Sequence, residues 1–121
     1  MATNTFWYFK TLIFHGTASG AVPVCRLVYF TSGGLLALCP SATRPDGVAP
    51  ATYADGDIMG AHRLGQCFVE TDGTAGVGTY IKAAADGSGK GVLDSAPGIV
   101  TAGKVLSLDA TTNIAKVQLF I

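Results

Sequence analysis

The side chains in this sequence that could do chemistry are three cysteines and two histidines. Cys25, Cys39, Cys67 and His62 could together supply the four sulfur and nitrogen ligands that a zinc ion takes. Structural zinc sites usually draw their ligands in closely spaced pairs, such as C-x-x-C, and the sequence contains no such pair. Three thiols also cannot all pair within one chain. The spacing therefore predicts free thiols that pack as small apolar groups, with no metal site and no disulfide framework.

A cysteine beside a histidine could act as a nucleophile, and the chain offers Cys67 with His62 and Cys25 with His15. Any chain with these residue counts offers such pairs, so they do not by themselves indicate catalysis. The G-x-S-x-G turn of the serine hydrolases is absent. Most of the eight carboxylates stand beside glycine, as they do in turns, rather than in pairs suited to acid–base catalysis. We therefore expect no catalytic residues and no enzyme.

Three glycine-containing segments are candidates for cation or nucleotide sites, and none of them fits the known patterns. Asp55-Gly56-Asp57, taken with Asp46, lacks the glycine and glutamate spacing of a calcium-binding EF-hand loop and is typical of a solvated turn. Gly89-Lys90 is followed by Gly91 instead of the Ser or Thr of a phosphate-binding loop. Gly76-Val77-Gly78 lacks the third glycine of a dinucleotide fingerprint. No cofactor is predicted.

Composition and charge exclude further classes of protein. The 121 residues fit one domain, 49% of them are hydrophobic, and only 13% are charged. Eight basic residues balance eight acidic ones, so the chain lacks the basic surplus of a nucleic-acid binder and the high net charge of a disordered tail. The apolar run over 6–14 is too short to span a bilayer, and no targeting segment is expected. A charge-poor surface is typical of a subunit that is buried against its neighbours.

Strand-forming runs alternate with turn signals throughout the chain, and no amphipathic helix of ten residues is evident. This pattern predicts an all-β fold, a small β-barrel or sandwich, formed by residues 15–121 as a single domain. We expect a hairpin of 22–30 with 35–39 about the turn Thr31-Ser32-Gly33-Gly34, a strand pair of 58–63 with 66–70 about Leu64-Gly65, and a final turn over 109–113 before a closing strand.

Residues 1–14 are expected to form an extended N-terminal arm or strand. Phe6-Trp7-Tyr8-Phe9 places four aromatic residues in succession, and on a strand their rings would face both sides, so both faces need cover. Stacking platforms for single-stranded nucleic acid pair aromatics with basic residues, and only Lys10 is near. Core packing and packing on a partner both remain open, and the second is favoured. The candidate partner-binding residues are Phe6, Trp7, Tyr8, Phe9, Leu12 and Phe14.

From Arg44 to Ile121 the sequence resembles the small capsid decoration, or cement, proteins of tailed bacteriophages. The resemblance lies in a "DGVA" element, an acidic–glycine turn, a strand that ends in valine, a further strand and turn, and a closing strand pair. In this chain these are Asp46-Gly47-Val48-Ala49, Ala54-Asp55-Gly56-Asp57, Gly65-Gln66-Cys67-Phe68-Val69, residues 76–85, and Gly103-Lys104-Val105-Leu106 with Ala115-Lys116-Val117-Gln118-Leu119.

The resemblance implies a non-enzymatic virion protein on the outer surface of the capsid, made in the bacterial host cytoplasm. Its partners would be the major capsid protein and further copies of itself, with a homotrimer favoured over a dimer. It would stabilise the head, and its aromatic arm would clamp a neighbouring subunit, partly by strand addition. The alternative is a small β-barrel module of a phage tail or cell surface that binds carbohydrate or another ligand in a concave aromatic pocket.

Overall fold

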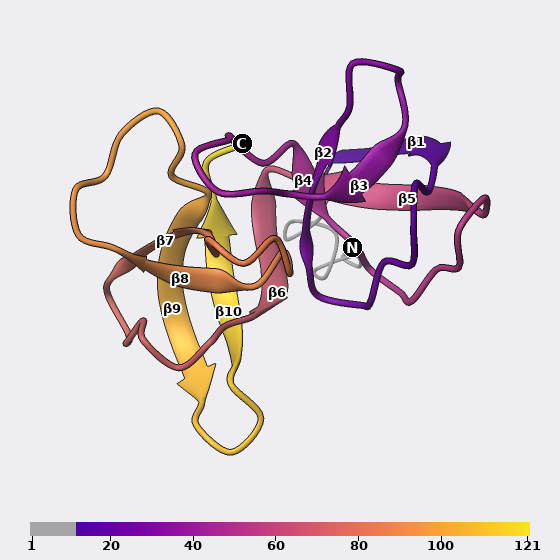
Figure 1. Cartoon of the computed structure of the whole chain (residues 1–121). Helices are drawn as coiled ribbons and strands as arrows, with labels where there is room; N and C mark the ends of the chain where they lie inside the picture. The colour runs from indigo at the N-terminus through magenta and orange to yellow at the C-terminus, as the bar shows by residue number, and fades with distance from the viewer. Residues whose placement is uncertain (1–11) are drawn as a thin grey trace, which may run out of the picture.

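The computed structural model describes residues 12–121, and this part of the chain contains ten β-strands and no α-helix (Figure 1). The prediction of an all-β fold is confirmed. The strands are β1 (Leu12–Thr17), β2 (Leu27–Phe30), β3 (Leu36–Leu38), β4 (Gly47–Val48), β5 (Ile58–Arg63), β6 (Gly65–Glu70), β7 (Tyr80–Ala83), β8 (Gly91–Asp94), β9 (Gly103–Asp109) and β10 (Ile114–Leu119).

The strands form two antiparallel sheets of five strands each. Sheet I has the order β1-β5-β4-β2-β3, and sheet II has the order β6-β10-β9-β7-β8. Figure 1 shows β5 of sheet I lying across the view, whereas β6, β9 and β10 of sheet II run up and down it. Neither sheet closes on itself, because each ends in two edge strands. Of the two architectures predicted, the barrel is therefore wrong, and an arrangement of two open sheets is observed.

Strands β5 and β6 are separated by Leu64 alone, yet they belong to different sheets. The expected pairing of these two strands with each other is wrong: β5 pairs with β1 and β4, whereas β6 pairs with β10. The backbone at the bend permits this separation. Leu64 and Gly65 both have left-handed backbone angles, with φ of 63° and 72°, and this conformation turns the strand out of its own sheet.

Two hairpins lie where their turn residues predicted them. In the first, β2 and β3 pair with Phe30 opposite Leu36, and the amide of Thr31 donates to the carbonyl of Leu35 at 2.7 Å. In the second, β9 and β10 pair through a turn in which the amide of Asn113 donates to the carbonyl of Asp109 at 2.7 Å. Asn113 adopts φ of 59°, a left-handed conformation that asparagine tolerates well.

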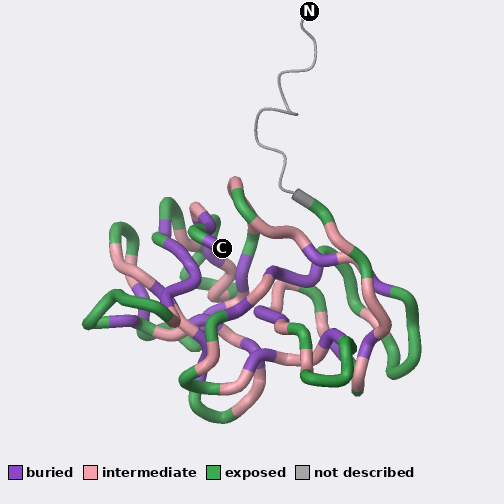
Figure 2. The backbone as a smooth tube through the Cα atoms, turned by 90° about the horizontal axis from the view of Figure 1, so that it is seen from above, coloured by how far each residue is buried: buried purple, intermediate pink, exposed green. Residues whose placement is uncertain are grey.

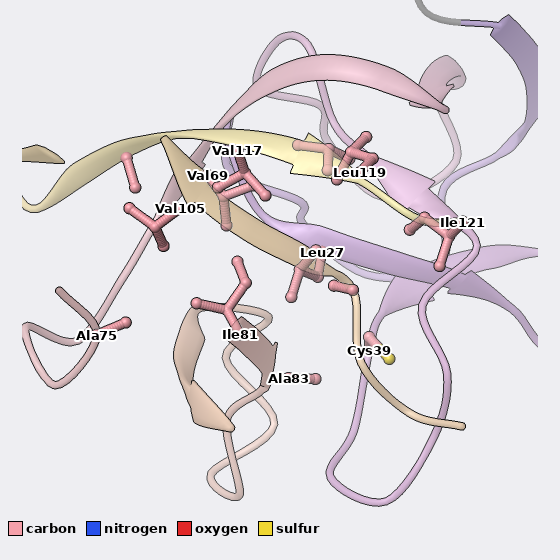
Figure 3. Close-up of a cluster of buried hydrophobic side chains, with 13 residues drawn as sticks. Leu27, Cys39, Val69, Ala75, Ile81, Ala83, Val105, Val117, Leu119 and Ile121 are labelled. Carbon is pink, nitrogen blue, oxygen red and sulfur yellow. The ribbon is translucent and has the colours of Figure 1, made fainter. Parts of the chain in front are cut away.

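The two sheets share a hydrophobic core. Leu27 and Val48 of sheet I pack with side chains of sheet II such as Val69, Val105 and Val117, which Figure 3 shows converging from several strands. A second cluster lies on the other face of sheet I and includes Val28, because successive residues of β2 point to opposite faces. Buried positions follow the middle of the body in Figure 2, and exposed ones follow its loops.

Strand β1 runs across the boundary predicted between the arm and the domain. Residues 12–14 were assigned to the arm, and in the structure they form the first half of β1, which pairs along its whole length with β5. Leu12 lies opposite Arg63, at the end of β5 that precedes the bend at Leu64. The N-terminal segment therefore joins the body at the point where the chain passes from one sheet to the other.

Candidate partner-binding surface

The six residues predicted to bind a partner fall in two groups. Phe6, Trp7, Tyr8 and Phe9 lie outside the described residues, and Leu12 is described only by its place in β1. Phe14 is half-buried, its ring centroid lies 5.1 Å from that of Phe30, and it packs against the second core cluster. The side chain of Phe14 thus contributes to the packing of sheet I in its own chain.

Three of the residues considered for chemistry lie together. Cys25, His62 and Cys67 line one hollow of about 210 Å³, whose other lining residues are Val48, Ala49, Pro50, Gln66 and Phe68. This hollow, the Phe68 notch, lies between strands β4 and β5 of sheet I and the edge strand β6 of sheet II. His15 is not among its lining residues, so the pairing of Cys25 with His15 is not formed there.

The environment of the notch keeps its thiols protonated. Burial, followed by the nearby Cys25, raises the pKa of Cys67 to about 12, and burial followed by Glu70 raises the pKa of Cys25. Burial also lowers the pKa of His62 below its ordinary value of 6.5. Since the thiolate is the nucleophile and the metal ligand, these cysteines are poorly suited to either role at neutral pH. All three cysteines are free, and Cys39 is buried in the core shared by the sheets.

Within residues 12–121, no group of three or more His, Cys, Asp or Glu side chains is arranged to hold a metal ion. No helix in the described part of the chain is long and apolar enough to cross a membrane.

Phe68 forms the rim of the notch. Its side chain is 59% exposed, and a second hollow of about 220 Å³, lined by Gln66, Cys67, Phe68 and Lys116, lies beside it. Val69 is fully buried, so the alternation of β6 directs Val69 inward and Phe68 outward. A large aromatic ring thus stands between two hollows, on a strand with one unpaired edge in sheet II.

Exposed apolar side chains also lie on the face of sheet I that carries His62. Ile13 lies directly opposite His62 in the β1–β5 ladder, so the two side chains share a face, and Ile13 is 51% exposed. Ile58, on the same face of β5, is 79% exposed. Exposed apolar side chains such as these and Phe68 are typical of surfaces that contact a partner.

The wall of the notch is fixed by a small polar network. The amide of Glu70 donates to the carbonyl of Cys25 at 2.8 Å, which attaches the segment before β2 to the edge of β6. The Glu70 carboxylate also accepts from Arg26 Nε at 3.3 Å and lies 3.6 Å from Lys90 Nζ. Arg26 in turn donates from Nη1 to the carbonyl of Ser88 at 2.8 Å. These contacts hold the segment before β2 against β6, and this arrangement forms one wall of the notch.

Arg63, opposite Leu12, carries an unsatisfied donor. Among the described residues its Nε is buried and has no hydrogen-bond partner. Such groups are rare in native structures, because a buried donor without an acceptor is destabilising. One buried hydrogen-bond donor near the start of β1 thus lacks an acceptor among the described residues.

The notch could not be recognised from the residue types. Cys25, His62 and Cys67 were considered as zinc ligands together with Cys39, and in the nucleophile pairs Cys67 with His62 and Cys25 with His15. Neither Phe68 nor Pro50 was a candidate binding residue. The alternation of β6, with Cys67 and Val69 directed inward, was a signal that could have marked Phe68 as outward-facing. No local signal could have predicted that Cys25 lies beside β6, because the two are far apart in the sequence.

No protein-family model matches the sequence, and no curated protein matches it. A solved structure does match: "The crystal structure of head fiber gp8.5 N base in bacteriophage phi29" superimposes with a TM-score of 0.72. The match covers 90% of this chain and 93% of that one, at 19% sequence identity. The two chains share a fold.

The shared fold extends over nearly the whole of the phi29 head fiber base. The resemblance to proteins of the bacteriophage head, which the sequence analysis stated on glycine and apolar spacing alone, is thereby confirmed at the level of the fold. At this identity the side chains of the two proteins mostly differ, so the comparison does not by itself assign a role to any residue of the notch.

Proposed function

We propose that this chain is a non-enzymatic structural protein of a bacteriophage head, located on the outer surface of the capsid. It binds the major capsid protein and forms a homo-oligomer, with a trimer favoured over a dimer. The observation that carries the proposal is the fold shared with the phi29 head fiber base over 90% of the chain.

The surface of the described body supports this proposal. Only 13% of the residues are charged, and several large apolar side chains are exposed, among them Ile13, Ile58, Phe68, Val77 and Phe120. Contacts between subunits remove such side chains from water. In an oligomer each copy repeats the same contacts, so modest individual contacts add up to tight attachment to a repeating shell.

The stabilising effect follows from binding linkage. A protein that binds the intact shell and not its dissociated subunits stabilises the shell by RT ln(1 + [L]/Kd). At a free concentration 100-fold above Kd this amounts to about 2.7 kcal/mol for each site. The stabilisation needs no catalytic group and no cofactor.

Co-sedimentation tests the proposal. The purified full chain is mixed, over a range of concentrations, with empty capsids of its own phage and centrifuged. Saturable recovery in the pellet at a fixed ratio to the capsid subunit, with a raised melting temperature of the capsid, is the expected result. Recovery only in the supernatant at every concentration would contradict it. Saturable binding to a glycan array, without co-sedimentation with capsids, would favour the carbohydrate-binding alternative.

A further inference from the structure

The Phe68 notch has the size and chemistry of a socket for one aromatic ring. Its volume of about 210 Å³ exceeds the roughly 150 Å³ of an engineered apolar cavity that holds a benzene molecule. Val48, Ala49 and Pro50 form one side of it, and the protonated thiols of Cys25 and Cys67 behave as small apolar groups. The exposed ring of Phe68 lies at the rim, where an incoming ring can pack against it edge to face.

The chain itself supplies the matching side chains. Residues 1–11 precede the described body and include the run Phe6-Trp7-Tyr8-Phe9. Phe9 is three residues before Leu12, so it can lie up to about 10 Å from the start of β1. The aromatic run can therefore reach a neighbouring molecule that contacts the body near Arg63.

The strand order favours the notch of a neighbouring copy over the notch of the same chain. In sheet I, β5 separates β1 from β4, so the start of β1 at Leu12 lies on the side of β5 opposite to Val48, Ala49 and Pro50. To fill the notch of its own chain, the segment would have to cross over β5. An arm from a neighbouring copy can reach that notch without crossing this β5 strand.

We propose that the Phe68 notch binds an aromatic side chain from the run Phe6–Phe9 of a second copy of this chain. This inference rests on the homo-oligomer of the proposed function and names the contact that holds the copies together. In a closed ring of copies, each notch is then filled by the arm of the next copy, so that all contacts are identical, as the symmetry of homo-oligomers requires.

Photo-crosslinking in solution, without capsids, tests the contact. Photoreactive benzoylphenylalanine replaces Phe6, Trp7, Tyr8 and Phe9 in four separate full-length variants, each mixed in ¹⁴N- and ¹⁵N-labelled form before irradiation. In at least one variant we expect crosslinks between light and heavy chains that map to the peptide containing Gln66, Cys67 and Phe68. Crosslinks confined to a single chain, intermolecular crosslinks that map elsewhere, or no crosslinks in all four variants would each overturn the inference.

A matched pair of surface variants provides the control. Phe68→Ala removes the rim and should lower the crosslink yield at least tenfold, whereas Ile99→Ala removes an 83% exposed side chain outside the notch and should leave the yield unchanged. Both positions are exposed, so both variants should keep the circular dichroism and melting temperature of the parent chain. Equal yields from the two variants would also overturn the inference. Because no capsid is present, this result is independent of the co-sedimentation experiment.

Discussion

Thr101 Oγ1 donates a hydrogen bond of 2.7 Å to Asp94 Oδ2, and both residues are buried. The Thr101 hydroxyl also accepts from the amide of Gly98 at 2.8 Å, while Asp94 Oδ1 accepts from the amide of Ala96 at 3.1 Å. The carboxylate and the hydroxyl thus hold the loop between β8 and β9 from within. The network has a structural role, because its side chains accept hydrogen bonds from backbone amides of the loop.

Thr101→Val should lower the free energy of unfolding by about 1–3 kcal/mol. The change keeps the shape of the side chain and leaves a buried carboxylate oxygen and the amide of Gly98 without their partner. Urea denaturation followed by circular dichroism measures the effect. Thr111→Val, at an exposed turn position, is the matched control and should change stability by less than about 0.5 kcal/mol. Equal effects of the two substitutions would contradict the role of the network.

Gly103→Ala should be destabilising by about 1–3 kcal/mol or more, because the site has no room for a methyl group. A Cβ atom there would overlap the carbonyl oxygen of Gln118 and lie 2.7 Å from Val117 Cγ1, at the Leu119 end of the β9–β10 ladder. The matched control is Gly76→Ala, where a Cβ atom would meet nothing within 4 Å. Thermal unfolding of the two variants should separate them clearly. A parent-like melting temperature for Gly103→Ala would show that this packing is wrong.

The buried thiols predict a loss of stability at alkaline pH. The pKa of Cys67 is about 12 in the folded chain and 9.0 without burial, so the folded state binds this proton more tightly than the unfolded state does. Stability is therefore fully present below pH 9 and falls as the pH rises toward 12. Cys39, with a pKa also raised to about 12 by burial, acts in the same direction. Calorimetric scans from pH 8 to 11 should show a falling melting temperature.

The control for the alkaline effect is a variant with Cys39→Ala and Cys67→Ala. Its melting temperature should depend less steeply on pH than that of the parent chain, even if its stability at pH 8 is lower. An identical slope in the two proteins would show that other groups cause the alkaline loss.

Removing residues 1–11 should dissociate the proposed oligomer while leaving the body folded, since β1 begins at Leu12. Light scattering coupled to size-exclusion chromatography should find a mass near that of one shortened chain. Removing residues 2–5 only is the control, because it keeps the aromatic run and should keep the oligomer. A shortened chain without residues 1–11 that retains the oligomeric mass would contradict the role of the arm.

Local signals in the sequence were enough for the hairpins and failed for the bend. Turns such as Thr31-Ser32-Gly33-Gly34 and 109–113 fix their flanking strands through residues that are close together, so they could be predicted. Leu64-Gly65 gives a similar signal, but β6 pairs with β10, whose residues come nearly fifty positions later. The choice of β10 as the pairing partner of β6 depends on the packing of Val69 and Val117 in the shared core, which no local pattern reveals.

The candidate surface was predicted in part for the same reason. The aromatic run Phe6–Phe9 is visible in the sequence, whereas the notch is assembled from Cys25, β4, β5 and β6 by a hydrogen bond between Glu70 and Cys25. Such a hollow exists only after the chain has folded, so its position could not be predicted from residue spacing. Phe14 shows the converse, because it looked like part of the arm and proved to pack against Phe30.

The single residue between β5 and β6 has a mechanical consequence. Because the two strands are covalently continuous through Leu64, a tensile load applied to one sheet reaches the other along the main chain as well as through side-chain contacts. The β1–β5 and β6–β10 ladders then share that load on either side of the bend. A body linked in this way resists being pulled into two halves.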